Sequence, residues 1–92
     1  MSDKLTSPWR IAEDAVANAV GGETVILHLG NGNYYGLDTI GTVLWDGLKL
    51  GKLPSEVCDD IVAEYGVERA QVDADIARFL TELEENELVE AV

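Results

Sequence analysis

The chain has 92 residues, of which 47% are hydrophobic, and 18 Asp and Glu against 6 Lys and Arg give a formal net charge of −12. A chain of this length buries roughly 60–65% of its unfolded surface, so we expect one domain over residues 1–92 with a single modest core. The charge repels phosphate backbones and anionic lipid surfaces and attracts basic partners, so neither nucleic acid nor a membrane is an expected partner.

The N-terminal fifth of the chain has weak patterns. Residues 1–8 show no periodic apolar residues, and we expect a loose arm there. We predict a first short strand over residues 15–20, although its alanines would equally suit a helical turn. Gly21-Gly22 then favours a turn.

The clearest local signal is a β-hairpin. Val25, Leu27 and Leu29 alternate with Ile26 and His28, which is the period of a half-buried strand over about residues 23–29. Residues 30–33 (Gly-Asn-Gly-Asn) tolerate positive φ and predict a reversal. A short aromatic return strand over about residues 33–37 follows.

Three helices are predicted after the hairpin. Asp38 stands at an N-cap position, and apolar residues with helical spacing follow over about 39–49, with Gly51 just past the end. A second helix has Pro54 in its first turn and ends at Gly66. A third helix runs from near Glu68 to about residue 86. Its apolar face consists of Val72, Ile76, Phe79, Leu80 and Leu83, and Leu88 and Val89 close the core behind it.

The order of these elements predicts the fold class. Three strands precede three helices, which is typical of an α+β domain with a winged-helix-like arrangement. We expect a three-stranded antiparallel sheet followed by a three-helix bundle.

No catalytic or metal-binding constellation is visible in the sequence. His28 is the only histidine and is expected to be a partly exposed strand residue, while Cys58 shares an apolar helix stripe and is expected in the core. One His and one Cys cannot form a structural zinc site, and no Ser-His-acid set is available. We therefore expect neither an enzyme nor a bound cofactor.

Two further classes are excluded by composition. Residues 68–87, the helix that would read DNA in a winged-helix protein, carry seven acidic residues against two arginines. No apolar run approaches the ~18 residues that span a bilayer, and no secretory signal is visible. A single cysteine suits a reducing compartment, so we expect a cytoplasmic location.

Three motifs in order resemble the PqqD-like family, whose members are leader-recognition domains of ribosomal peptide modification systems. The family pattern is an aromatic return strand and then Leu-Asn-x-x-Gly-x-x-x-Trp, which residues 34–45 match with Asp38 in place of Asn. Residues 64–67 (Glu-Tyr-Gly-Val) match the end of the second helix, and residues 75–83 match Asp-Val-x-x-Phe-Leu-x-x-Leu. The resemblance spans about residues 23–89 and is greatest to the stand-alone leader-binding subunit of lasso-peptide biosynthesis.

The resemblance implies a function and a site. In the family, the leader of a precursor peptide adds as a strand beside the third strand of the sheet, in a groove against the third helix. The residues that this implies as peptide-binding are Asn33, Tyr34, Tyr35, Gly36, Leu37, Val72, Asp73, Ile76 and Leu80. Strand alternation assigns Tyr35 and Leu37 to the inward face and Tyr34 to the outward face. Asp73 is expected at the polar rim, and Phe79, Leu83 and Trp45 in the core. For Val72, Ile76 and Leu80, an ordinary core position is the equally weighted alternative.

The expected partners follow from the resemblance too. They are the precursor leader peptide and a leader peptidase or other modifying enzyme, to which a non-catalytic adaptor, monomeric or weakly dimeric, would deliver the precursor. The alternative is a winged-helix interaction or regulatory module that binds another protein without binding a leader.

Overall fold

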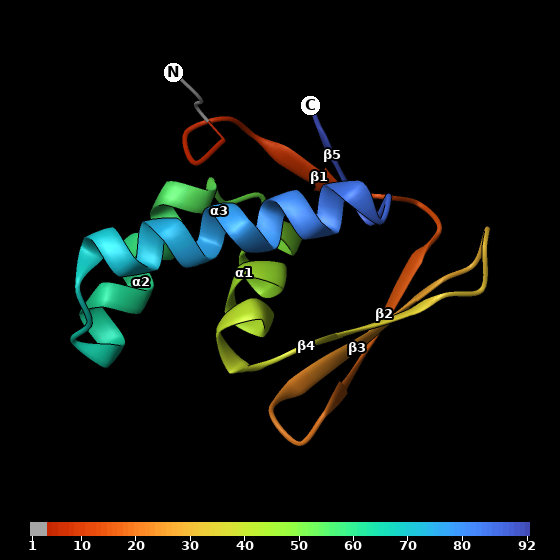
Figure 1. The fold of residues 1–92 in the computed structure, drawn as a ribbon, viewed down its shortest axis with the longest axis horizontal. Coiled ribbons are helices and arrows are strands. Elements are labelled where there is room, and N and C mark those ends of the chain that lie inside the picture. Colours follow the sequence, from red (N-terminus) through yellow and green to blue (C-terminus); the bar gives the residue numbers. More distant parts are fainter. Residues whose placement is uncertain (1–3) are drawn as a thin grey trace.

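Five strands and three helices follow one another along residues 4–92, the part of the chain that the computed structural model describes (Figure 1). Their bounds are β1 Trp9–Ile11, β2 Ala15–Val20, β3 Glu23–His28, β4 Tyr34–Leu37, α1 Thr39–Lys49, α2 Pro54–Tyr65, α3 Arg69–Glu85 and β5 Val89–Ala91. The predicted α+β class is confirmed, as are the predicted hairpin and all three predicted helices. The winged-helix-like arrangement stays a prediction. No helix in the described residues is long and apolar enough to cross a membrane.

The central sheet is antiparallel in the order β2-β3-β4. The β2–β3 turn is tight because Gly21 and Gly22 both have positive φ, 57° and 85°, which costs glycine little. Val20 lies opposite Glu23 across that turn, and Ile26 lies opposite Tyr35 on the next strand pair. The six residues of β2 confirm the first predicted strand over the helical alternative.

The two faces of the sheet differ in burial. Thr24 and Ile26 are buried against the helices, whereas Val25 and Leu29 are exposed, at 36% and 59%. The alternation was therefore predicted correctly, and the face of β3 that packs into the core is the one that carries Ile26, not the one that carries Val25 and Leu29. On the opposite face, Val16, Leu27 and Tyr34 are cross-strand partners and form a row of apolar side chains. Val16 and Tyr34 are exposed, and Leu27 is half-buried.

Turn chemistry explains the helix ends. The Asp38 carboxylate accepts the backbone N–H of Gly41 (2.9 Å) and caps α1. The Glu56 carboxylate accepts the backbone N–H of Leu53 (2.7 Å) at the start of α2, and Gly66 ends α2 in the left-handed region with φ 63°.

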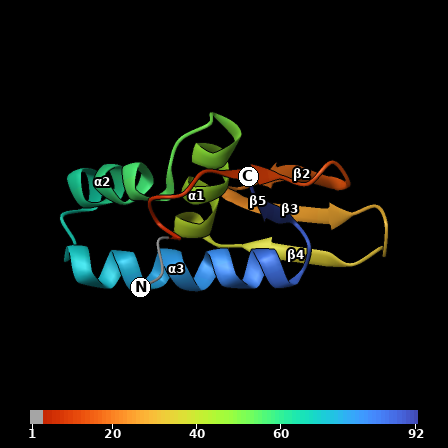
Figure 2. The same ribbon diagram turned by 90° about the horizontal axis from the view of Figure 1, so that it is seen from above.

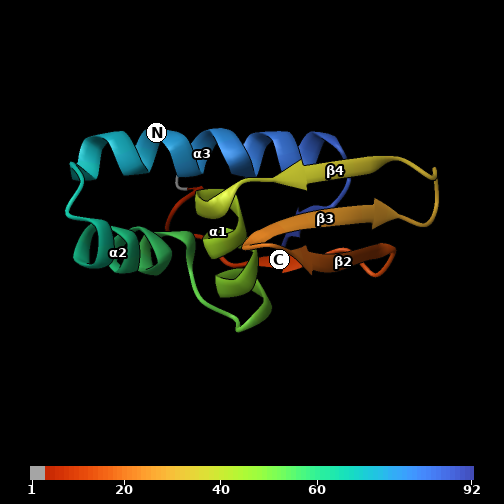
Figure 3. The same ribbon diagram turned by 90° about the horizontal axis from the view of Figure 1, so that it is seen from below.

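The helices form a layer beside and over one face of the sheet. Figures 2 and 3 show α3 running alongside β4, α2 lying next to α3, and α1 filling the space between them and the sheet. The α1–α2 contact is close, because a Cβ on Gly47 would lie 2.5 Å from a methyl of Val57. The core comprises Trp9, Ile26, Leu37, Leu44, Trp45, Leu48, Val57, Cys58, Ile61, Val72, Ile76, Phe79, Leu80, Leu83, Leu88 and Val89.

A small ribbon of β1 and β5, which the sequence did not predict, joins the two ends of the described chain. It pairs Trp9 with Ala91 and Ile11 with Val89. The segment expected to be a loose arm, residues 1–8, is described from Lys4 onward, and residues 1–3 lie outside the description. Within it, Leu5 packs against the core and its carbonyl accepts the backbone N–H of Ser55 (2.7 Å).

Candidate functional site

Strand β4 has one paired side and one open side. The backbone N–H of His28 donates to the carbonyl of Asn33 (2.9 Å), which makes these two residues a hydrogen-bonded pair at the end of the β3–β4 ladder. Such pairs alternate with non-hydrogen-bonded ones along antiparallel strands. In the β3–β4 register, Tyr35 and Leu37 therefore also direct their backbone groups toward β3.

The open side of β4 consists of the residues between those pairs. Tyr34 and Gly36 direct their N–H and C=O groups away from β3, toward the side where α3 runs (Figure 3). Of residues 33–37, which were all expected to offer backbone groups to an added peptide strand, only Tyr34 and Gly36 have N–H and C=O groups that point to the open side. An extended peptide beside β4 would exchange hydrogen bonds with both.

Tyr35 connects β4 to α3. Its side chain lies on the inner face of the sheet, as predicted, and its hydroxyl donates to a carboxylate oxygen of Glu82 (2.7 Å). Burial of the phenol, and then the hydrogen bond and the negative charge of Glu82, raise the pKa of Tyr35 to about 12. The pair therefore sets the distance between strand and helix at this point.

The face of α3 that meets β4 and α1 is one step around the helix from the predicted one. Glu82 reaches Tyr35, the Phe79 ring lies against Gly41 at the start of α1, and Asp75 lines a pocket with Ile40. Arg78, which lies 3.8 Å from carboxylates of both Asp75 and Glu82, stacks on the Phe79 ring with 4.8 Å to the centroid. The sequence had identified Phe79 in this row, as a core residue, but not Arg78 and Glu82, because a charged side chain gives no apolar signal.

The residues predicted on α3 occupy different environments. Ile76 and Leu80 have no exposed surface and belong to the core, and Phe79 and Leu83 are in the core as predicted. Asp73 is half-buried and accepts a hydrogen bond from Arg69 (2.7 Å), and it does not line the pocket described next, so the structure gives no support for its expected place at the rim of the groove. Val72 is buried, yet it also forms part of the wall of an open pocket.

That pocket, which we call the apolar pocket, lies beyond the C-terminal end of β4. Its volume is about 170 Å³, and its walls come from the ends of all three helices. It is lined by Ile40, Ile61, Tyr65, Val67, Gln71, Val72 and Asp75. Tyr65 and Val67 are exposed, at 44% and 41%, so an apolar side chain entering here would cover surface that water now contacts. Residue spacing alone could not find this pocket, because the end of α2 contributes to it.

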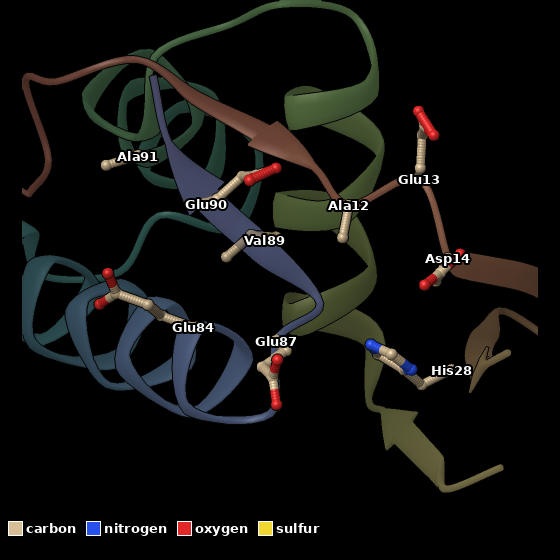
Figure 4. Close-up of a pocket in the computed structure, with 9 residues that line it drawn as sticks. All are labelled: Ala12, Glu13, Asp14, His28, Glu84, Glu87, Val89, Glu90 and Ala91. Carbon is tan, nitrogen blue, oxygen red and sulfur yellow. The ribbon is translucent and has the colours of Figure 1, made fainter. Parts of the chain in front are cut away.

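A larger cavity of about 480 Å³ lies at the other end of α3 and is strongly acidic (Figure 4). Carboxylates of Glu13, Asp14, Glu84, Glu87 and Glu90 line it together with His28. The His28 Nδ1 accepts the backbone N–H groups of Gly30 (3.0 Å) and Asn31 (3.3 Å), so this nitrogen is used to hold the hairpin turn. Among the described residues, no group of three or more His, Cys, Asp or Glu is arranged to hold a metal ion.

Comparison with known proteins places this geometry in context. Residues 23–89 match the family model described as coenzyme PQQ synthesis protein D (PqqD). No curated protein matches the chain.

Two solved structures are similar over almost the whole chain. One is "TbiB1 in Complex with the TbiA(beta) Leader Peptide", with 42% identity, a TM-score of 0.83, and coverage of 88% of this chain and 94% of that one. The other is "Lasso peptide synthetase B1 complexed with the leader peptide", with 26% identity, a TM-score of 0.84, and coverage of 91% and 99%.

Proposed function

This chain belongs to the PqqD family, and from that premise we propose that it is a non-catalytic adaptor that binds the leader segment of a ribosomally made precursor peptide. The observation that carries the proposal is the open backbone edge of β4, which lies beside α3 and leads to the apolar pocket. The two similar structures, both described as leader-peptide complexes, support it. The second of them, a lasso peptide synthetase B1, also favours a lasso-peptide pathway.

The mode of binding follows from the edge. A leader strand beside β4 would pair with the backbone of Tyr34 and Gly36, and these bonds give net stabilisation of about 1 kcal/mol each. Ordering a flexible peptide costs more than a few such bonds return. An apolar leader side chain in the apolar pocket, against Val67 and Ile40, supplies the remainder.

The delivery step requires a surface for the modifying or processing enzyme. The outward row of Val16, Leu27 and Tyr34 supports this role, because it is an apolar face on a chain of net charge −12. A leader strand added to β4 would extend the same face. We therefore expect the enzyme to contact this row and the outward side chains of the bound leader together.

The test is a titration of the protein with a labelled leader peptide from a precursor encoded beside it, followed by fluorescence anisotropy. We expect a Kd between about nanomolar and micromolar, which is about −12 to −8 kcal/mol. Gly36→Pro removes one donor from the open edge without removing a bond to β3. The unpaired leader carbonyl costs about 1–3 kcal/mol, so affinity should fall about 5- to 150-fold.

Ala17→Pro is the matched control, because the Ala17 N–H also points away from the ladder but lies on β2, at the opposite edge of the sheet. Its affinity for the leader should equal that of the wild type. Equal loss in both variants, or no binding by a folded wild-type protein, would reject leader binding at β4.

A further inference from the structure

The opposite edge of the sheet, on β2, is open as well. The backbone N–H of Leu29 donates to the carbonyl of Asp14 (2.8 Å), so this pair is hydrogen-bonded, and in the β2–β3 register Val16 and Asn18 are too. Ala17 and Ala19 therefore direct their N–H and C=O groups away from β3. No further strand of the described chain pairs with them.

This edge has none of the features that protect exposed strands. The sequence of β2 is Ala-Val-Ala-Asn-Ala-Val, which contains no proline and no charged residue, and all six residues pair with β3 in unbroken register. Natural proteins usually protect such an edge with charge, proline or a bulge, because it accepts strands from other chains. The edge of β4 differs, since α3 runs beside it (Figure 3).

A small pocket of about 120 Å³ opens at the β2 edge. It is lined by Ile11, Ala15, Ala17, Trp45 and Lys49. Trp45 is only 2% exposed, and its indole N–H is buried without a hydrogen-bond acceptor in the described structure. A buried donor without a partner costs about 1–3 kcal/mol, so an acceptor supplied from outside would recover stability. In contrast, the indole N–H of Trp9 donates to the carbonyl of Lys4 (2.9 Å).

Lys49 at the mouth of this pocket is also unusual. Among the residues that the structure describes, Lys49 is the one Lys or Arg without a carboxylate within 4.0 Å. The other five pair as Lys4–Glu84, Arg10–Glu90, Lys52–Asp60, Arg69–Asp59, Arg69–Asp73, Arg78–Asp75 and Arg78–Glu82. On α1 it lies one turn after Trp45 and is exposed, so its flexible side chain can move aside. A group that enters the pocket would therefore meet the positive charge of Lys49 and lie against Trp45, the residue with the unpaired donor.

We propose that the β2 edge and this pocket form a second strand-docking site, which takes an extended segment of a partner protein that carries a carboxylate side chain. The segment pairs with the backbone of Ala17 and Ala19. Its carboxylate enters the pocket, accepts the Trp45 N–H and pairs with Lys49. The site lies at the opposite edge of the sheet from β4, so it is independent of leader binding and stands whether or not the proposed function holds.

The test is NMR titration of the ¹⁵N-labelled protein with two synthetic peptides, acetyl-Thr-Val-Asp-Val-Thr-amide and its Asn counterpart. The Asp peptide should shift the Trp45 indole signal and the Ala17 and Ala19 amides, while the Trp9 indole signal stays fixed as an internal control. The Asn peptide should bind about threefold more weakly, the size of one exposed ion pair. Absence of these shifts, or shifts confined to Tyr34 and Gly36, overturns the proposal.

Two variants separate the charge from the edge. Lys49→Gln should make the two peptides bind equally, whereas Lys52→Gln, a matched lysine that pairs with Asp60, should keep their difference. Ala17→Pro removes one outward donor and should weaken binding of both peptides about 5- to 150-fold, with circular dichroism as the check that the variant is folded. If Lys49→Gln preserves the preference for Asp, the assignment of the carboxylate to this pocket is wrong.

Discussion

The hydrogen bond from Tyr35 to Glu82 connects β4 to α3, and Tyr35→Phe removes it with almost no change in shape. The hydroxyl and the carboxylate are 2.7 Å apart. Hydrogen bonds to charged groups contribute about 1.5–3 kcal/mol, but the Glu82 side chain is 41% exposed, so solvent screening lowers the expected loss to about 1 kcal/mol. For a domain of this size, that corresponds to a melting temperature about 4–8 °C lower.

The pH dependence makes this prediction specific. The pKa of Tyr35 is about 12 in the folded protein and 10.0 as the ordinary value. Because the folded pKa is raised, the stabilising effect is fully present below pH of about 10 and is lost as the pH rises through about 12. The difference in unfolding free energy between wild type and Tyr35→Phe should therefore be constant near neutral pH and should decline above pH of about 10.

Urea unfolding followed by far-ultraviolet circular dichroism measures this difference. Burial raises the pKa of the Cys58 thiol to about 12 as well, and the charge of Glu64 raises that of Tyr65, so both proteins lose stability in alkali. Subtracting the two curves isolates Tyr35. A Phe variant that is as stable as the wild type at neutral pH, or a difference that does not change with pH, would refute the role assigned to the hydrogen bond.

Three further outcomes are expected. Gly47→Ala should destabilise the protein by about 1–3 kcal/mol despite the better helix propensity of alanine, because the new Cβ would meet Val57. In thermal unfolding, the added loss caused by Gly47→Ala should disappear when Val57→Ala is present as well. Asp38→Ala should lower the free energy of unfolding by about 1 kcal/mol through loss of the cap on Gly41, whereas Asp38→Asn should be nearly neutral, and an equal loss in both would contradict the capping role. Val67→Asp should weaken leader binding about tenfold in the anisotropy assay with little effect on stability, since the side chain is 41% exposed, and unchanged affinity would remove the apolar pocket from the site.

Local patterns were sufficient to predict most of the fold. The three helices were placed within about one residue, because each has a 3.6-residue apolar stripe and a residue that starts or ends it, such as Asp38 or Gly66. The β1–β5 ribbon was not predicted. Each of its strands has three residues, too few to show alternation, and pairing such as Trp9 with Ala91 joins segments that no local pattern connects.

The candidate site was predicted less completely than the fold. Alternation placed Tyr35 and Leu37 inward and Tyr34 outward correctly. An apolar helix face, however, identifies what is buried and not which neighbour it meets, so Ile76 and Leu80 were candidates although they lie within the core. The contacts of α3 with β4 depend on Glu82, whose role became visible only when the helix and strand were placed side by side.

The β1–β5 ribbon has a consequence for protein engineering. Trp9 lies opposite Ala91, and the backbone N–H of Val92 donates to the carbonyl of Pro8 (3.2 Å), so the end of the chain lies beside the start of β1. Such a domain can be circularly permuted with a linker that leads from Val92 to the segment before β1, and with the chain opened in the Gly21–Gly22 turn. Neither step cuts β4 or α3. The β4 edge and α3, where we propose that the leader binds, would therefore stay intact in such a permuted protein.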